Sequence, residues 1–274
     1  MSNRVRQRTR LAQQVRRADT AARQAHDRRI RLRAGIAAVV VIAAVVVAVV
    51  LVNRPDHSGS AAPQQSYEAV APGCRWIDLP TAGRSKDMTD VGQPPTGMPP
   101  SAGTSTMTIT TNLGVITAKL DLAQAPCSVR SMAFLAGKKF FDNTSCHRLS
   151  TSYHTLTCGD PSATGEGGVT YRIYDENVPV NNRPAYPAGA ITLANEGPNT
   201  QGSQFDLFYD DTEELEPTMP VIGRITDGLD ILKKAAEAGQ ADSAFDTLPN
   251  GTDGPGGGHP KQQVTITSLT VSGP

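Results

Sequence analysis

The sequence predicts a mainly β domain with two helices, preceded by one transmembrane helix. Three observations support this prediction. Residues 34–52 form an uncharged apolar run, residues 106–271 contain β-branched segments of alternating polarity, and the same region holds two segments of helical periodicity. The chain therefore divides into an Arg-rich segment (1–33), a membrane anchor (34–52), a linker (53–105) and a folded domain (106–271).

The anchor is predicted from the nineteen residues 34–52, which are nearly all Val, Ala and Ile. At roughly 1.5 Å per residue, a helix of this length covers about 28 Å and nearly crosses a hydrocarbon core of about 30 Å. A cleaved signal peptide usually has a shorter apolar region, of about 7 to 15 residues, followed by small residues at the cleavage site. We therefore expect an uncleaved single-pass helix.

The charges on the two sides of this helix are strongly asymmetric. Residues 1–33 hold eleven Arg against Asp19 and Asp27, whereas the chain from Asp56 onward holds fourteen basic and twenty-four acidic residues. The positive-inside rule then predicts a cytoplasmic N-terminus and a C-terminal domain outside the cell membrane. Nucleic-acid binding by the Arg-rich segment is the alternative. Because the segment lies directly before the span, we favour the interpretation that its charges orient the helix in the membrane.

The linker, residues 53–105, is rich in Pro, Gly and Ser and is expected to lie outside the membrane. Its composition buries too little apolar surface to offset chain entropy. Two Pro-Pro pairs, at 94–95 and 99–100, favour extended polyproline-like backbone because proline fixes φ and lacks an amide donor. A short island from Tyr67 to Leu79 contains a Cys and the only Trp, and we expect it to be stapled onto the folded domain.

Within the folded domain, strands are expected where β-branched residues alternate with polar ones. These segments are residues 107–111, 115–120 and 264–271. A first helix is expected to begin with Ser128 as its N-cap and to end at Gly137. A second is expected over residues 229–238, with Asp227 as its N-cap and a following Gly as its stop.

Two local strings and their separation along the chain resemble the cyclophilins. The strings are Cys146-His147-Arg148-Leu149, followed by Cys158-Gly159-Asp160-Pro161, and Gly202-Ser203-Gln204-Phe205. Segments at 110–114, 189–195 and 221–224 follow in the family's order, so that the resemblance covers residues 106–271. With its predicted anchor, the chain is similar to a membrane-anchored bacterial form of the family, of the actinobacterial kind.

The resemblance implies a closed eight-stranded antiparallel barrel capped by two helices, and peptidyl-prolyl cis-trans isomerase activity without a cofactor. Rotation about an amide bond faces a barrier of about 18 to 20 kcal/mol because resonance is lost in the twisted state. A guanidinium that donates a hydrogen bond to the prolyl nitrogen stabilises that state. By resemblance, Arg148 has this role, Asn195 holds the substrate backbone, and Gln204 positions both the substrate and Arg148.

The same resemblance implies a pocket for the proline ring of a polypeptide substrate, and here the sequence departs from the family. Polar residues stand at several places where the family has aromatic or apolar ones. The implied substrate-binding residues are His154, Thr155, Thr157, Phe205, Asp206, Glu214, Leu215 and Met219. An ionised Asp206 beside the ring is costly to desolvate and competes for Arg148, so we expect low activity toward ordinary X-Pro peptides.

The chain has four cysteines, all on the expected outer side, where disulfides persist. Sequence alone leaves three pairings open. The resemblance places Cys146 and Cys158 on neighbouring strands, which leaves Cys74 for Cys127 at the start of the first helix. The spacings lack the Cys-x2-Cys pattern of a zinc site, and catalysis by a lone thiol is a weaker alternative. We expect neither a bound metal nor a cofactor.

Two functions from different classes remain. The first is a membrane-anchored peptidyl-prolyl isomerase that assists folding of exported, Pro-containing polypeptides, and the set Arg148, Asn195 and Gln204 favours it. The second is a non-catalytic cyclophilin-fold module for a Pro-containing or basic envelope partner, and the polar pocket favours it. Acidic residues between 210 and 216 would suit a cation or basic peptide, although a solvated acidic loop without an EF-hand pattern is the plainer interpretation.

Overall fold

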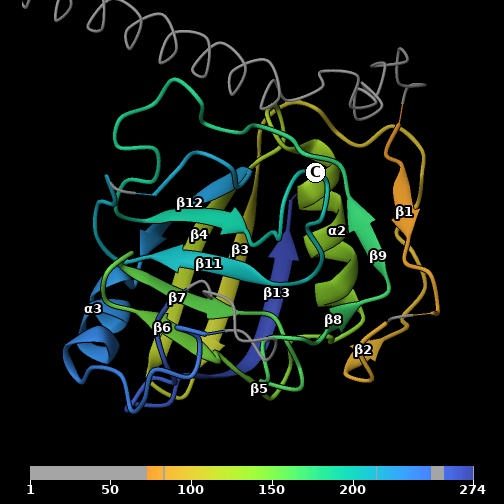
Figure 1. Cartoon of the computed structure of the whole chain (residues 1–274). Helices are drawn as coiled ribbons and strands as arrows, with labels where there is room; N and C mark the ends of the chain where they lie inside the picture. The colour runs from red at the N-terminus through yellow and green to blue at the C-terminus, as the bar shows by residue number, and fades with distance from the viewer. Residues whose placement is uncertain (1–72, 83, 214, 248–255, 274) are drawn as a thin grey trace, which may run out of the picture. The chain divides into compact units, whose positions relative to one another are not determined.

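The computed structural model describes residues 73–82, 84–213, 215–247 and 256–273 (Figure 1). The chain divides into two units, 1–68 and 69–274, and the described residues all belong to the second. The predicted Arg-rich segment and membrane anchor lie outside the described residues. Within the described ranges, no helix is long and apolar enough to cross a bilayer.

The described residues form a mainly β domain around one curled, antiparallel sheet of nine strands (Figure 1). The strands are β3 (Thr104–Thr111), β4 (Gly114–Asp121), β5 (Thr144–Ser145), β6 (Arg148–Ser150), β7 (Thr155–Cys158), β10 (Ala190–Leu193), β11 (Phe205–Phe208), β12 (Val221–Asp227) and β13 (Thr265–Ser272). Their spatial order is β5-β13-β3-β4-β12-β10-β11-β7-β6. The strands predicted at 107–111, 115–120 and 264–271 correspond to β3, β4 and β13.

Alternation along these strands determines which side chains enter the core. In β3, Met107 and Ile109 are buried inside the curled sheet, while the alternating residues Thr106, Thr108 and Thr110 point outward. Strand β4 follows the same pattern, with Ile116 and Leu120 buried and Lys119 exposed. The two strands pair along their whole length, from Thr104 opposite Asp121 to Thr111 opposite Gly114. The core therefore lies on the concave side, and outward-facing residues are available for function.

The sheet has nine strands where the resemblance implied eight, and the difference lies in residues 144–150. Strand β5 pairs with β13, whereas β6 pairs with β7 at the other end of the strand order. Between them, the Cys146 amide donates to the Val264 carbonyl (2.9 Å) and the His147 amide donates to the Thr157 carbonyl (3.0 Å). One continuous segment of chain thus contacts both ends of the sheet.

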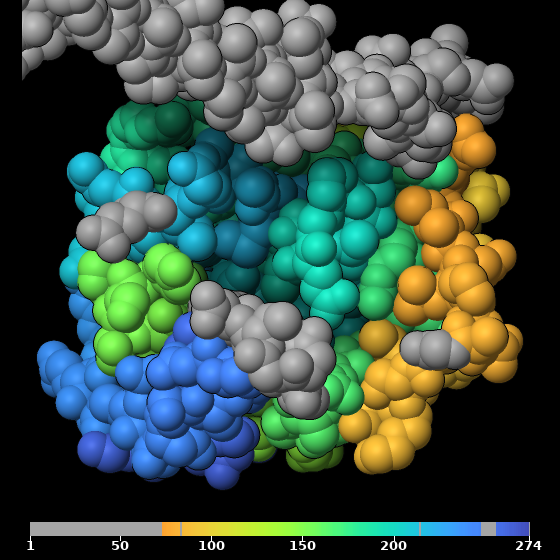
Figure 2. All heavy atoms as spheres, in the orientation of Figure 1, coloured from red at the N-terminus to blue at the C-terminus, as the bar shows by residue number. Residues whose placement is uncertain are grey.

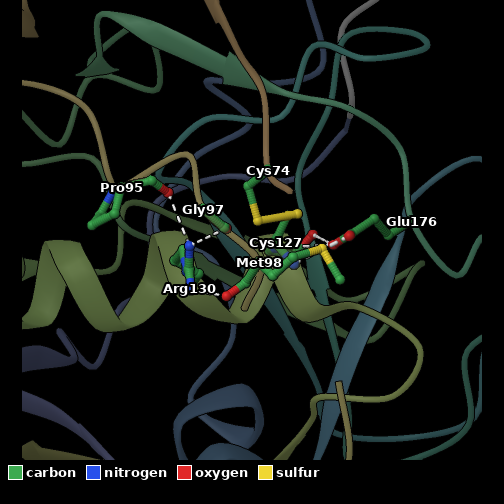
Figure 3. Close-up of a disulfide and its surroundings, with 8 residues drawn as sticks. Cys74, Pro95, Gly97, Met98, Cys127, Arg130 and Glu176 are labelled. Atoms are coloured by element: carbon green, nitrogen blue, oxygen red, sulfur yellow. Dashed lines mark hydrogen bonds between the residues drawn. A yellow bond between two sulfur atoms is a disulfide. The ribbon is translucent and has the colours of Figure 1, made fainter. Parts of the chain in front are cut away.

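Two helices occur in the described residues, α2 (Pro126–Gly137) and α3 (Leu229–Glu237). The predicted N-cap Ser128 is wrong, because Ser128 lies inside α2 and Pro126 occupies its first position. The carboxylate of Glu176, from a distant loop, instead accepts hydrogen bonds from the amides of Cys127 (3.1 Å) and Ser128 (2.8 Å) (Figure 3). An anion at this end also interacts favourably with the helix dipole.

The second predicted N-cap, Asp227, is also wrong, because this residue still belongs to β12 and pairs with Thr117. Gly228 stands at the N-cap of α3 with φ of 82°. A Cβ at this position would lie 2.5 Å from the Val115 carbonyl oxygen, so the chain turns from β12 into α3 only with glycine here. At the other end, Gly239 (φ 77°) follows the last turn of α3, as expected.

The segment before the sheet is fastened to α2 and to the sheet domain (Figure 3). Cys74 forms a disulfide with Cys127 in the first turn of α2. Arg130, one turn later, donates to the carbonyls of Pro95, Gly97 and Met98. Short strands add backbone pairing, namely β1 (Trp76–Asp78) with β9 (Tyr171–Ile173) and β2 (Met88–Thr89) with β8 (Gly168–Val169). The island around Trp76 is therefore stapled onto the domain, as expected.

Both expected disulfides are present, and the described chain has no free cysteine. Cys146–Cys158 spans 12 residues and links the segment before β6 to the end of β7, with the Cα atoms 4.0 Å apart. Cys74–Cys127 spans 53 residues. Because loop-closure entropy rises with loop length, the second bond restricts the unfolded chain more strongly than the first.

We predict that replacing Cys74 and Cys127 together by Ser lowers the free energy of unfolding by about 4 kcal/mol. The corresponding double variant of Cys146 and Cys158 should lose about 3 kcal/mol, since its loop is shorter. Denaturant unfolding measures both values, and peptide mapping without reductant should recover the two linked pairs. Free thiols at all four positions would contradict the pairing.

His147 lies in the segment that joins the two ends of the sheet, and its side chain is buried. Its ring contacts Phe245 edge-on, with the ring centroids 5.8 Å apart, and its Nδ1 has no hydrogen-bond partner among the described residues. Burial lowers the pKa of His147 from the usual 6.5 to about 4, although the charge of Asp160 opposes this shift. The folded domain therefore holds this imidazole neutral at physiological pH.

We predict that His147 makes the domain sensitive to acid. The unfolded chain binds this proton near pH 6.5 and the folded chain only near pH 4, so the stabilisation is complete above pH 6.5 and is lost as the pH falls toward 4. The difference corresponds to about 3 kcal/mol. Unfolding free energies at pH 7 and pH 4 should differ less in His147→Gln than in the parent chain. An unchanged pH dependence in this variant would contradict the assignment.

Candidate active site

Three polar side chains lie in one row across β6, β7 and β11. Arg148 is opposite Thr157, and Thr157 is opposite Asp206, in the strand register. The Arg148 Nε donates to the Thr157 Oγ1 (3.1 Å), and the Thr157 hydroxyl donates to the Asp206 Oδ1. The Arg148 Nη2 also lies 3.3 Å from the Asp206 Oδ1. The contact between Asp206 and Arg148, which the sequence led us to expect, is thus present.

This row faces away from the hydrophobic core. The neighbouring residues Leu149, Leu156 and Leu207 point inward and are buried in it, so strand alternation turns the polar row outward. For the same reason, the structure does not bring Phe205 to the site. Phe205 is fully buried and contacts the Phe141 ring edge-on, at 5.7 Å between centroids. The resemblance implied Phe205 as a substrate-binding residue, whereas its side chain lies in the core.

Arg148 is held on three sides, and 12% of its side chain is exposed. Besides Thr157 and Asp206, the carbonyl of Gly256 accepts from its Nη1 (3.3 Å). The adjoining Gly258 pairs with Leu149 through two backbone hydrogen bonds, of 2.8 and 3.0 Å. The segment 256–258 therefore lies along the outer edge of β6. Sequence reasoning missed this contact, because nothing in a Gly-rich stretch identifies its partner strand.

The other two residues of the implied catalytic set are fixed by backbone carbonyls. Gln204 donates from its Nε2 to the carbonyls of Gly165 (2.8 Å) and Gly167 (2.9 Å). Asn195 donates from its Nδ2 to the carbonyl of Thr218 (2.8 Å). Both side chains are partly exposed, and each follows or precedes a strand of the β10–β11 pair. These bonds fix the orientation of both side-chain amides.

Asp160 orders the loop that Gln204 contacts, and sequence reasoning missed it. Its buried carboxylate accepts hydrogen bonds from the amides of Ser162 (2.8 Å), Gly165 (2.7 Å) and Gly167 (3.1 Å). Burial raises the pKa of Asp160, but the hydrogen bonds from the Ser162 hydroxyl and from these amides outweigh burial, so the pKa lies below its usual value. An Asp just ahead of a Gly-rich stretch was the available signal, since such a stretch offers several free amides to one carboxylate.

The other implied substrate-binding residues lie on β7 or close to the row. Thr155, two residues before Thr157 on β7, is buried and faces the same side. His154, with φ of 53°, donates from Nδ1 to the Asp211 carbonyl (2.8 Å). Leu215 and Met219 pack in a small apolar cluster beside the row, together with Ala185, Tyr186, Ala190 and Phe208. Glu214 lies outside the described residues.

Tyr186 and Phe208, which the sequence did not indicate, belong to this apolar cluster. The Tyr186 ring stacks on the Phe208 ring at 4.9 Å, and the Tyr186 hydroxyl accepts from the Met219 amide (2.8 Å). Figure 2 shows a hollow on this face, between green atoms of the chain around residues 150–154 and teal atoms around residues 195–200. Among the described residues, no group of three or more His, Cys, Asp or Glu is arranged to hold a metal ion.

Comparison with known proteins connects this geometry to one family. Residues 106–271, more than half of the chain, match the family model described as cyclophilin type peptidyl-prolyl cis-trans isomerase. A probable peptidyl-prolyl cis-trans isomerase B of Mycobacterium leprae is 41% identical over 186 residues, covering 64% of this chain and 59% of the relative. The protein of the same description in Mycobacterium tuberculosis is 38% identical over 199 residues, covering 68% and 61%. The chain thus spans about three fifths of the length of these relatives.

A solved structure supports the fold. The crystal structure of a Cryptosporidium parvum cyclophilin type peptidyl-prolyl cis-trans isomerase aligns with a TM-score of 0.52 and 21% identity, over 63% of this chain and 99% of that chain. A second structure of that protein, determined in the presence of the dipeptide Ala-Pro, aligns with a TM-score of 0.51. From the family model and the shared fold, this chain belongs to the cyclophilin-type peptidyl-prolyl cis-trans isomerase family.

Proposed function

We propose that this chain is a peptidyl-prolyl cis-trans isomerase for exported proteins, with low activity toward ordinary X-Pro peptides. The observation that carries the proposal is the place of Arg148. Its guanidinium stands on the outer face of β6, held by Thr157, Asp206 and the Gly256 carbonyl, with part of its surface exposed. We also infer that β5 and β6 together correspond to one strand of the family's closed eight-stranded barrel.

The chemistry needs no nucleophile, since the barrier to rotation is the lost amide resonance. When the prolyl amide twists, its nitrogen regains a lone pair that a guanidinium N–H is able to bind. Arg148 binds that lone pair more strongly in the twisted state than in either planar state, which is the condition for catalysis. Asn195 and Gln204, whose amides are oriented by backbone carbonyls, hold the peptide backbone on the two sides.

Asp206 limits this activity in two ways. Its carboxylate replaces apolar surface beside the proline ring, and desolvating a carboxylate without new donors costs free energy. It also pairs with Arg148 at 3.3 Å inside a site where only 1% of the Asp206 side chain is exposed. An ion pair in such a place is less screened than one at the surface, so it competes with the prolyl nitrogen for the guanidinium.

A non-catalytic binding module is the second candidate, and the same Asp206 supports it. If the pair with Arg148 persists when a peptide binds, the domain holds a Pro-containing or basic segment of an envelope partner without turning it over. The two candidates differ in one measurable quantity, the rate at which the cis and trans forms of a bound peptide interconvert.

We further propose that residues 34–52 anchor the protein in the cell membrane as a single helix. The N-terminal Arg-rich segment then lies in the cytoplasm, and the cyclophilin-type domain lies outside on the linker of residues 53–105. The charge asymmetry of the sequence supports this orientation. The two disulfides support the outer location of the domain, because such bonds persist in oxidising compartments.

We predict that Asp206→Phe raises the isomerisation rate on an Ala-Pro peptide by about tenfold, equivalent to about 1.4 kcal/mol. The phenyl ring restores an apolar wall and releases Arg148. Adding Arg148→Ala to this variant should abolish the gain, and in this background the substitution leaves no buried Asp206 charge unpaired. Line-shape or exchange NMR on the peptide measures the rate. A wild-type rate equal to that of ordinary cyclophilins would contradict this account of the pocket.

For topology, we predict that a reporter active only in the cytoplasm is silent when fused after Pro274. The same reporter fused before Met1 should be active and serves as the matched control. The charge difference across residues 34–52 is the physical reason for both outcomes. Strong signal from the C-terminal fusion would reverse the orientation.

A further inference from the structure

Two buried polar atoms in the pocket lack hydrogen-bond partners among the described residues. They are the Asp206 Oδ2 and the Thr155 Oγ1, in residues of which 1% and 2% of the surface is exposed. Thr157 lies directly opposite Asp206, and Thr155 is two residues away on the same strand, so both orphan atoms face the same side. Buried polar groups normally have partners, and one left without them costs free energy.

Among the described residues, the two donors that contact Asp206 bind the same carboxylate oxygen. Thr157 and Arg148 both donate to Oδ1, which leaves the second carboxylate oxygen without a donor. A carboxylate accepts about four hydrogen bonds, so this one lacks about half of its possible partners. The Tyr186 hydroxyl, in the adjoining apolar cluster, is bound to the backbone of Met219 and Glu216. Among the described residues, no donor therefore reaches the Asp206 Oδ2, which leaves this oxygen for a donor group of a bound peptide.

The charges around the pocket indicate whether the missing donor group is cationic, neutral or part of an acidic side chain. The loop after β11 presents four exposed carboxylates in the described residues, Asp210, Asp211, Glu213 and Glu216. Arg148 is the cation of the row, and Asp206 already balances it. The His154 Nδ1 donates a hydrogen bond to the Asp211 backbone carbonyl. The rim is thus negative overall, which attracts a cation and repels an acidic side chain.

We propose that the pocket recognises the ammonium or guanidinium of a Lys or Arg that stands next to the substrate proline. This inference rests on the proposed function and names the class of peptide that the site prefers. The cation donates to the free Asp206 Oδ2 and to the Thr155 Oγ1, while its alkyl stem lies along Met219 and Leu215. By neutralising Asp206, it weakens the hold of that carboxylate on Arg148, whose guanidinium then turns to the prolyl nitrogen.

The test compares peptides that differ only in the charged group. Isomerisation by the full chain is measured at low ionic strength on matched peptides with Lys, norleucine or Glu beside Pro, on either side. Norleucine keeps the stem of Lys and removes its ammonium. We expect kcat/KM for the better Lys peptide to exceed that of its norleucine match by about tenfold or more, with Glu lower still. Equal values for Lys and norleucine at both positions would overturn the proposal.

Variants locate the effect at Asp206. Asp206→Asn, which is nearly isosteric, should reduce the Lys-to-norleucine ratio to below about twofold, and Thr155→Val should reduce it in part. Asp230→Asn removes an exposed carboxylate on α3 and should leave the ratio unchanged. If Asp206→Asn does not fold, the double variant Glu213→Gln with Glu216→Gln should lower the ratio and its dependence on salt. An unchanged ratio in a folded Asp206→Asn chain would place the recognition elsewhere.

Binding separates this proposal from the proposed function. If the wild-type chain isomerises none of the peptides, the proposed catalytic function fails, and fluorescence anisotropy on labelled peptides still tests the pocket. Tighter binding of the Lys peptide than of the norleucine peptide, lost in Asp206→Asn, would then support cation recognition by a non-catalytic site. Equal binding of the two peptides would overturn the inference on its own.

Discussion

The register between β6, β7 and β11 is the constraint on which the site depends. It places Arg148, Thr157 and Asp206 opposite one another, so that three residues distant in sequence form one hydrogen-bonded row. A shift of one residue in any of these strands would turn its polar residue inward and bring its neighbouring Leu to the surface. The Cys146–Cys158 bond joins the segment directly before β6 to the end of β7, and it therefore opposes such a shift between these two strands.

The sequence predicted most of the architecture, because strands, helices and the family motifs leave local signals. The alternation in residues 107–111 and 115–120 identified β3 and β4, and the pattern around Arg148 identified the site. The predictions of the two helix N-caps were wrong. Local capping chemistry favoured Ser128, whereas the amides of α2 are satisfied by Glu176, which lies almost fifty residues later in the chain. Such long-range pairing leaves no short-range pattern to read.

Within the site, too, residues with a local sequence signal could be predicted, whereas residues that act through long-range contacts could not. Asp206 stood out in the sequence because a carboxylate is unusual in a proline pocket, and its contact with Arg148 follows from strand register. Gly256, Asp160 and Tyr186 could not be assigned roles, since each acts through a partner that only the tertiary fold identifies. Phe205 was misplaced for a simpler reason. Neighbours along a strand point to opposite faces, so Phe205 enters the core while Asp206 faces the other way.

The attachment of Cys74 to α2 has a mechanical consequence for the membrane tether that we propose. Tension that arrives along the chain from its N-terminal side reaches Cys74 before it reaches β1, and the covalent bond carries the load directly into Cys127. The short β1–β9 pairing and the contacts of Arg130 with the proline-rich segment lie behind this junction and are shielded from it. Pulling on the tether therefore loads the first turn of a core-packed helix and does not peel strands from the sheet edge.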